Sequence, residues 1–324
     1  MAVRVITGCR LHFGFRNLCL GESRIYGGIG VYLENPKISL VAKANNEVVC
    51  EDWNVEKYAR KITEILEVEG IEIEILETIP AHMGLGSGTQ LALAIYAAIC
   101  EEYDIKPMYR EHAPQLGRGK RSGIGVASFE VGGFNMDRGQ ETGTVAIGEG
   151  KGWKVPNREI SLKIPKEWVF VVSELEVERG YSGKKEKEII NFVMENAKSN
   201  ITRKIETIVH KNLIPSIQEK KSADFGFAVG EISRLNGNWY EKYQGGIYRP
   251  PIGKIVKRLQ EYDNIFGVGQ SSWGPTLYSV TNEEHATEVE RTIRELLEEL
   301  EIRGTVIRST VKNSGADIRK DILE

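Results

Sequence analysis

The sequence of 324 residues has few cysteines, and they show no pattern of their own. Cys9, Cys19, Cys50 and Cys100 are far apart and form no CxxC pair. This spacing argues against a zinc site and against a thioredoxin-type redox motif. Scattered cysteines without a disulfide framework favour a reducing compartment, so we expect a cytoplasmic protein.

Long apolar runs and an excess of positive charge are also missing. The longest apolar run, LALAIYAAIC at 91–100, falls well short of the roughly 20 residues that a membrane helix requires. The first residues contain no apolar stretch of the signal-peptide type, so we expect neither export nor membrane insertion. With 43 Lys plus Arg against 46 Asp plus Glu, the formal charge is −3, which disfavours nucleic acid as a partner.

Glycine is the residue in surplus, with 34 of 324 positions against a background of about 7%. The glycines gather in three segments, at 80–89, at 110–148 and at 264–280. Because glycine lets the backbone approach a ligand closely, this surplus predicts loops that bind through their backbone. The remaining composition, 41% hydrophobic and 27% charged, is that of a globular protein.

Hydrophobic periodicity predicts an α+β protein of two domains, 1–163 and 164–324. In the first half we expect strands at 3–8, 28–34, 38–44 and 71–77, a helix at 55–69 capped by Gly70, and a buried helix at 89–100. In the second half we expect a strand at 168–175, helices over 184–235, two strands within 264–280, a helix at 283–301 and a strand at 304–311. The order in the second half predicts a ferredoxin-like sandwich.

The most informative segment is PAHMGLGSGT at 80–89, which precedes the buried helix. Its glycines and the amides of the helix N-terminus predict an anion site, most often one for phosphate. The candidate binding residues are Gly84, Leu85, Gly86, Ser87, Gly88 and Thr89. The alternative is a tight turn into a buried helix, and the absence of a lysine after the last glycine excludes a Walker A loop.

PxxxGLGSG between a strand and an Ala-rich helix resembles the GHMP kinase superfamily. RSGIG at 121–125 with a glycine pair at 132–133, and GVGQSSWGP at 267–275, are similar to its other two motifs. The resemblance implies a ribosomal-protein-like N-terminal α+β domain and a ferredoxin-like C-terminal domain. It also exposes two departures, because Gly125 stands where the kinases carry an aspartate and HAPQLGRGK at 112–120 lacks their magnesium-binding glutamate. A chain without both acids is a doubtful kinase.

Basic residues occupy the region from which the acids are missing. Arg118, Lys120 and Arg121 form either a solvated surface or a clamp for a phosphate ester. Near the N-terminus, Arg10 and Arg24 accompany His12, which is either a structural histidine or a candidate acid or base.

The strings RLHFGFRNL, RIYGGIGVYL, GRGKRSGIGVASFEVGGFNMDRG and GQSSWGPTLYSV resemble the archaeal β-ribofuranosylaminobenzene 5′-phosphate synthase family over nearly the whole chain. The resemblance implies a condensation of 4-aminobenzoate with phosphoribosyl pyrophosphate that releases CO2 and pyrophosphate, on the route to methanopterin. It also suggests a homodimer and Mg²⁺ as the cofactor. The usual signature of phosphoribosyltransferases, two adjacent acids after a hydrophobic strand, is absent.

For this reaction we assign the residues by role. We expect pyrophosphate on the glycine loop, helped by the hydroxyls of Ser87 and Thr89, and the ribose phosphate on the basic cluster of Arg118, Lys120 and Arg121. The acceptor pocket would be Phe13, Phe15 and Tyr26 between Arg10 and Arg24, unless these aromatic residues belong to the core.

The catalytic candidates are His12, Arg24 and Asp137. Asp137 would bind Mg²⁺ together with Ser87, or would only cap a turn beside Gly139. Two other functions stay open at this point, an ATP-dependent small-molecule kinase and a catalytically silent protein that senses a sugar or nucleotide.

Overall fold

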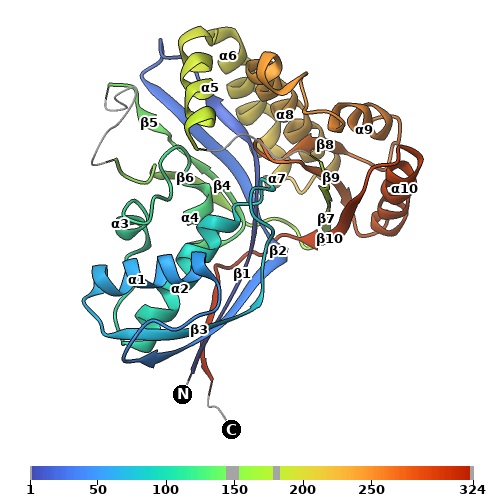
Figure 1. Cartoon of the computed structure of the whole chain (residues 1–324). Helices are drawn as coiled ribbons and strands as arrows, with labels where there is room; N and C mark the ends of the chain where they lie inside the picture. The colour runs from blue at the N-terminus through green and yellow to red at the C-terminus, as the bar shows by residue number, and fades with distance from the viewer. Residues whose placement is uncertain (1, 144–152, 178–182, 322–324) are drawn as a thin grey trace.

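The computed structural model describes residues 2–143, 153–177 and 183–321 (Figure 1). Two long antiparallel strands, β1 (Ala2–Asn17) and β2 (Arg24–Asn45), form the centre of the first sheet. The other strands of this sheet are β3 (Gly70–Glu77), β4 (Phe134–Asp137), β5 (Gln140–Glu141), β6 (Arg158–Leu162) and β11 (Asp317–Asp321). The main order is β11-β1-β2-β4-β6, and β3 and β5 pair with other parts of β2.

The helices of this half lie together beside the lower part of the first sheet (Figure 1). They are α1 (Trp53–Leu66), α2 (Ser87–Glu102), α3 (Tyr109–His112) and α4 (Ile124–Val131). Helix α2 is apolar on nearly every side, and all residues from Ala92 to Cys100 are buried. The prediction of a buried helix after the glycine loop is therefore confirmed, although its first residues, Ser87 to Thr89, are only half-buried.

The second sheet contains β7 (Trp168–Leu175), β8 (Gly267–Gln270), β9 (Thr276–Asn282) and β10 (Gly304–Thr310). Its helices are α5 (Gly183–Asn196), α6 (Ser199–Ile208), α7 (Ile214–Gln218), α8 (Ser222–Gln244), α9 (Ile252–Leu259) and α10 (Ala286–Glu299), with a π-helical turn η1 (Val209–Leu213). All strand pairs are antiparallel in the order β10-β7-β9-β8. In chain order this is 4-1-3-2, the arrangement of a ferredoxin-like sandwich, as predicted.

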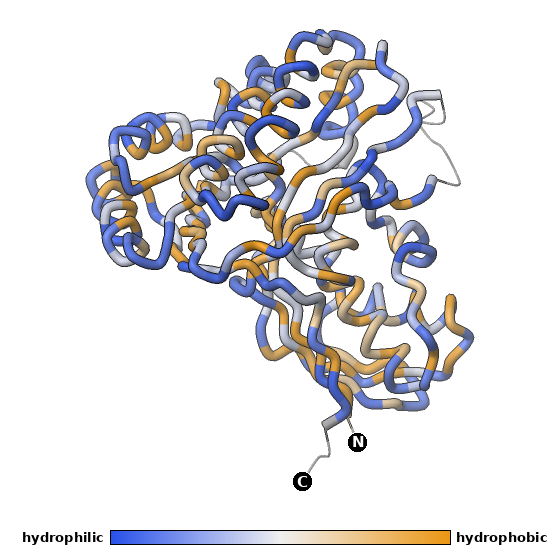
Figure 2. Tube along the Cα trace, turned by 180° about the vertical axis from the view of Figure 1, so that it is seen from behind, coloured by the Kyte–Doolittle hydropathy of each residue, from blue (hydrophilic) through white to orange (hydrophobic). Residues whose placement is uncertain are grey.

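The chain changes sheets between β6 and β7, which is where the sequence predicts the boundary at residue 163. The chain returns to the first sheet at β11, which pairs with β1 and brings the two ends of the chain together (Figure 1). The cores of the two halves are continuous, since Phe13 of β1 packs against Phe170, Phe225 and Tyr278. In Figure 2 the apolar stretches follow the strands and the inner sides of the helices.

Two local expectations are wrong. Helix α1 ends at Leu66 with Glu67 in the left-handed conformation as its C-cap, so Gly70 does not cap it. Gly70 instead begins β3, where a Cβ would lie 2.3 Å from the backbone carbon of Glu47, and only glycine allows this approach. The strands expected at 28–34 and 38–44 are one continuous strand, β2. Among the described residues, no helix is long and apolar enough to cross a membrane.

Candidate functional site

The glycine loop leads directly into α2. Gly84 and Gly86 have φ angles of 88° and 75°, which favour glycine, and Gly86 is the N-cap of α2. No side chain caps this N-terminus, and its first turn contains no acidic residue. The amide of Thr89 donates to the carbonyl of Gly86, so the helix dipole and the amides of Ser87 and Gly88 are available to an anionic ligand.

A second glycine segment, from the other domain, fixes this loop in place. Ser271 donates a hydrogen bond through Oγ to the carbonyl of Gly84 at 2.8 Å. At Gly274 a Cβ would lie 2.0 Å from the carbonyl oxygen of Met83, so the two backbones are in direct contact. The three motifs of the sequence thus meet at one place, where the two domains join.

Two arginines lie on either side of the first turn of α2. The Cβ position of Gly86 is 3.2 Å from Nε of Arg10, and that of Gly88 is 2.9 Å from Nη2 of Arg118. Arg10 also donates to the carbonyl of Gly84 at 3.2 Å, while the guanidinium of Arg118 lies 5.4 Å from the ring centroid of Tyr58.

Neither guanidinium pairs with a carboxylate within the described part of the chain, and Nε of each is buried without a hydrogen-bond partner. Burial lowers the pKa of Arg10 to about 10 and also lowers the pKa of Arg118. Both arginines are half-buried, and charges withdrawn from water are normally paired, so these two cations beside a helix N-terminus indicate a site for a multiply charged anion.

Gly125, which stands where the resembling kinases carry an aspartate, lies in α4 and faces the same loop. Its Cβ position is 3.1 Å from Cγ2 of Thr89, and its carbonyl accepts a hydrogen bond from Gln90 at 2.9 Å. This wall of the site therefore presents no carboxylate.

The three residues of the predicted basic cluster have different neighbours in the structure. Arg118 points to α2, whereas Arg121 forms an ion pair with Glu186 of α5 at 2.7 Å. The charge of Arg121 also lowers the pKa of Tyr26, although burial raises that pKa overall. Lys120 is exposed to solvent.

His12 begins a chain of three hydrogen-bonded side chains that ends at Asp137. Nε2 of His12 lies 3.2 Å from Oγ of Ser122, which in turn lies 3.2 Å from Oδ2 of Asp137. His12 and Asp137 are both buried. Burial, and secondarily the charge of Arg10, lowers the pKa of His12 well below its usual value, so its ring is neutral at pH 7.

Asp137 does not fit the predicted role of a metal ligand. Its Oδ1 accepts a hydrogen bond from the amide of Gly139, and its Oδ2 accepts one from the amide of Gly123, both at 2.8 Å. Its oxygens are directed at the protein, and burial raises its pKa to about 6. No cluster of three or more His, Cys, Asp or Glu side chains suited to a metal occurs among the residues described here. The donor set therefore does not fit a resident metal ion.

Beside His12 is a small aromatic cavity of about 40 Å³ between the two domains. Phe15 contacts His12 edge-on at 5.0 Å, and the rings of Tyr240 and Trp273 meet edge-on at 4.7 Å. The hydroxyl of Tyr240 is buried and lacks a hydrogen-bond partner within the described residues. Tyr26 joins this group through Phe15 at 5.5 Å.

Phe13, expected in this pocket, borders the cavity, but its ring is buried in the hydrophobic core. The register of β1 against β2 shifts between His12 and Gly14, so Phe13 and Phe15 point to different surroundings.

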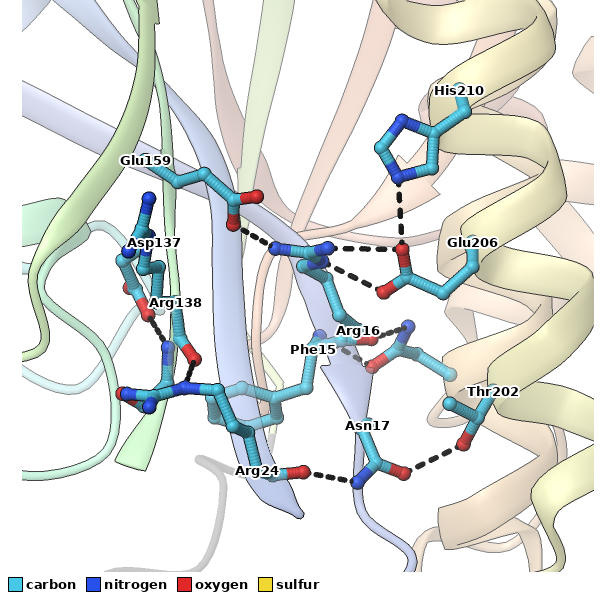
Figure 3. A network of polar contacts seen from close by, with 12 residues as sticks. Phe15, Arg16, Asn17, Arg24, Asp137, Arg138, Glu159, Thr202, Glu206 and His210 are labelled. Atoms are coloured by element: carbon cyan, nitrogen blue, oxygen red, sulfur yellow. Dashed lines mark hydrogen bonds and ion pairs between the residues drawn. The ribbon is translucent and has the colours of Figure 1, made fainter. Parts of the chain in front are cut away.

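Arg24, predicted as a catalytic residue, lies outside the group around His12. Its Nε and Nη2 donate to the carbonyls of Arg138 and Gly139 at 2.7 and 2.9 Å, and its side chain is 42% exposed (Figure 3). Figure 3 also shows Arg16 between Glu159 and Glu206. Arg16 thus joins the end of β1 to β6 and α6, whereas Arg24 joins the start of β2 to the turn between β4 and β5.

Sequence reasoning missed four residues of the site: Ser122, Glu186, Tyr240 and Trp273. Ser122 and Trp273 lie within motifs that the sequence shows, RSGIG and GQSSWGP, but a serine or tryptophan in a loop carries no signal of its own. Tyr240 and Glu186 come from helices of the second domain, and only the tertiary fold brings them here.

Comparisons with known proteins agree with this arrangement. Residues 53–133 match the family model of the GHMP kinases N terminal domain, and residues 215–299 match that of the GHMP kinases C terminal region. In overall fold the chain is similar to galactokinase of Lactococcus lactis in complex with galactose (TM-score 0.67, 13% identity, 98% of this chain and 95% of that one). It is also similar to mevalonate kinase of Methanococcus jannaschii (TM-score 0.66, 15% identity, 96% and 98%).

Two relatives are similar in sequence over most of the chain, and both are named β-ribofuranosylphenol 5′-phosphate synthase. The protein from Methanothermobacter thermautotrophicus is 31% identical over 294 residues, covering 86% of this chain and 88% of the relative. The protein from Archaeoglobus fulgidus is 29% identical over 325 residues, covering 98% and 99%. The chain therefore belongs to the GHMP kinase superfamily, and within it to the family of the archaeal β-ribofuranosyl phosphate synthases.

Proposed function

We propose that this protein condenses a para-substituted benzoate with phosphoribosyl pyrophosphate and releases CO2 and pyrophosphate. The observation that carries the proposal is the pair of desolvated guanidiniums of Arg10 and Arg118 at the glycine loop, on a wall where Gly125 supplies no acid. A kinase needs its metal and acidic residues near the transferred phosphoryl group. A site for a departing pyrophosphate needs donors and positive charge instead.

In this proposal pyrophosphate occupies the first turn of α2. As the bond between the anomeric carbon and the pyrophosphate oxygen breaks, negative charge grows on the leaving group. Arg10, Arg118 and the first-turn amides stabilise that charge, together with the hydroxyls of Ser87 and Thr89. Mg²⁺ would enter bound to the pyrophosphate of the substrate, since the described side chains offer no set of ligands for it.

The acceptor ring is assigned to the aromatic cavity of Phe15, Tyr240 and Trp273. We assign the carboxylate of the ring to Arg121, because burial raises the pKa of Tyr26 and of Tyr240 and the charge of Arg121 partly lowers both. Arg121 would exchange Glu186 for the substrate. The 40 Å³ cavity is smaller than a benzoate, so binding also requires these side chains to move apart.

The acceptor is either 4-aminobenzoate, which the sequence resemblance implies, or 4-hydroxybenzoate. The name of the two relatives favours the second, because loss of CO2 from a ribosylated 4-hydroxybenzoate gives a ribofuranosylphenol phosphate. Both substituents donate electrons to the carbon that bears the carboxyl group, and this carbon attacks the sugar.

The test is to incubate the purified protein with phosphoribosyl pyrophosphate, Mg²⁺ and each benzoate, and to identify the product by mass spectrometry. We expect a decarboxylated ribosyl phosphate product from at least one acceptor. A parallel incubation with ATP and sugar, homoserine or mevalonate acceptors should leave ATP intact. Phosphorylation of any of these alcohols, with no ribosylation of either benzoate, would overturn the proposal in favour of a kinase.

A further inference from the structure

We propose that Ser122 and Asp137 are positioning residues that hold the proton of His12 on Nε2, so that Nδ1 accepts the proton of a 4-hydroxyl group on the acceptor. This inference rests on the proposed function, because it assigns a step of that reaction. It adds a prediction that the proposed function alone does not make. The chain of three residues should matter for a hydroxybenzoate and much less for an aminobenzoate.

The hydrogen bonds around Ser122 determine which nitrogen of His12 carries the proton. Ser122 has one hydroxyl proton, and an ionised Asp137 can only accept, so Ser122 donates to Oδ2 of Asp137. The oxygen of Ser122 also accepts from the amide of Ile124 at 3.2 Å. At the 3.2 Å contact with His12, Ser122 therefore has only a lone pair left to offer, and Nε2 of His12 must be the donor. A neutral ring then leaves Nδ1 unprotonated.

The surroundings of the three side chains keep this arrangement fixed. At Gly28 a Cβ would lie 2.1 Å from Oγ of Ser122 and 2.9 Å from Oδ2 of Asp137, so only glycine leaves room for the pair. The amides of Gly123 and Gly139 hold the carboxylate of Asp137 from two sides. With a pKa of about 6 the carboxyl group of Asp137 is ionised at neutral pH, so it can accept the hydrogen bond from Ser122.

We place the free nitrogen of His12 on the side of the acceptor, because Nε2 is directed at Ser122 and His12 borders the cavity. His12 lines the aromatic cavity together with Phe15 and Tyr240. No hydrogen bond within the described residues involves its Nδ1, whereas Nε2 and the backbone amide and carbonyl are all engaged. Arg10 is the charged group beside the ring, and it lowers the pKa of His12. An anion bound at Arg10 offsets that charge and makes Nδ1 a better base when the donor substrate is present.

The chemistry of the two acceptors differs in its need for a base. In a 4-hydroxybenzoate, the carboxyl-bearing carbon forms its bond to the anomeric carbon as the bond to pyrophosphate breaks. The hydroxyl proton passes to Nδ1 of His12, and the ring becomes a cyclohexadienone. The bond to CO2 then breaks, its electron pair restores the aromatic ring, and His12 returns the proton to the oxygen. In a 4-aminobenzoate the nitrogen lone pair forms an iminium with no proton lost, and loss of CO2 restores the amine.

The first test compares turnover of the two acceptors by wild type and Ser122→Ala. We expect kcat with 4-hydroxybenzoate to fall at least tenfold more than kcat with 4-aminobenzoate, since a positioned base typically contributes about 10²-fold or more. The matched control is Ser128→Ala, which removes another buried serine hydroxyl, in α4, away from the reacting groups. An equal loss with both acceptors would mean a merely structural role and would overturn the inference. Absence of turnover with either acceptor in wild type would refute the proposed function itself.

The second test needs no turnover. The ¹⁵N resonances of the histidine side chains report which ring nitrogen is protonated, and the His12 signal is identified by its loss in His12→Gln. We expect wild type to show the Nε2–H tautomer at pH 7 and Ser122→Ala to lose this preference. A wild-type ring protonated on Nδ1, or on both nitrogens, would overturn the inference.

Discussion

Replacing Gly88 by alanine should separate the stability of the protein from its ability to bind pyrophosphate. Gly88 is the second residue of α2 and has helical backbone angles, so alanine fits the backbone there. Alanine favours a helix over glycine by up to about 1 kcal/mol. The new Cβ would lie 2.9 Å from Nη2 and 3.1 Å from Cζ of Arg118, which is too close, so the guanidinium must move away from the first turn.

The expected cost to binding follows from the contacts that Arg118 loses. A hydrogen bond between charged groups contributes about 1.5–3 kcal/mol, which corresponds to roughly a ten- to hundredfold weaker affinity for pyrophosphate. The affinity can be measured by calorimetry with inorganic pyrophosphate, and the melting temperature of the same samples gives the stability. We expect the variant to melt no lower than wild type.

The matched control is Gly253→Ala, which also changes the second residue of a helix, in α9. There the nearest atoms are 3.9 Å from the Cβ position, and affinity should not change. If the alanine acts through Arg118, combining Gly88→Ala with Arg118→Ala should weaken binding little more than Arg118→Ala alone. Wild-type affinity for pyrophosphate in both Gly88→Ala and Arg118→Ala would refute the assignment of the anion site to the first turn of α2.

Three further outcomes are expected. Arg121→Lys keeps the charge but loses the planar guanidinium, so KM for the benzoate should rise several-fold while KM for phosphoribosyl pyrophosphate changes little. A rise in KM for phosphoribosyl pyrophosphate with an unchanged KM for the benzoate would instead assign Arg121 to the ribose phosphate. Arg10→Gln removes a cation beside His12, so the pKa of His12, followed by NMR titration, should rise yet stay below 6.5, because burial is the larger cause. Burial raises the pKa of Asp137 from 3.8 to about 6, so the folded state keeps a proton that the unfolded state releases. The contribution of Asp137 to the unfolding free energy should therefore fall by about 3 kcal/mol as pH rises from about 3 to about 7, and denaturant titrations of Asp137→Asn should lack this pH dependence.

The sequence predicts the features that depend on local patterns. The alternation in β3, the apolar helix α2 and the order of elements from β7 to β10 are periodic signals, and the structure confirms them. The glycine loop is also a local signal, because its glycines are needed for the backbone angles at Gly84 and Gly86.

Local sequence patterns do not predict the directions of individual side chains. Arg118 and Arg121 are three residues apart, yet they face different partners, because Gly117 and Gly119 turn the backbone with φ angles of 73° and 85°. Residues that arrive from the other domain, such as Tyr240 and Trp273, become part of the site only through contacts distant in sequence. The sequence therefore predicts where the glycine loop lies, but it does not show that Arg118 and Arg121 have different neighbours.

The most direct test of the central claim is to follow the carboxyl carbon of the acceptor. The protein is incubated with phosphoribosyl pyrophosphate, Mg²⁺ and 4-hydroxybenzoate or 4-aminobenzoate labelled with ¹⁴C in the carboxyl group, and released ¹⁴CO2 and pyrophosphate are counted together. We predict one CO2 for each pyrophosphate, with no release when phosphoribosyl pyrophosphate is omitted. Pyrophosphate release without ¹⁴CO2, or no release of either from both acceptors, would contradict the account.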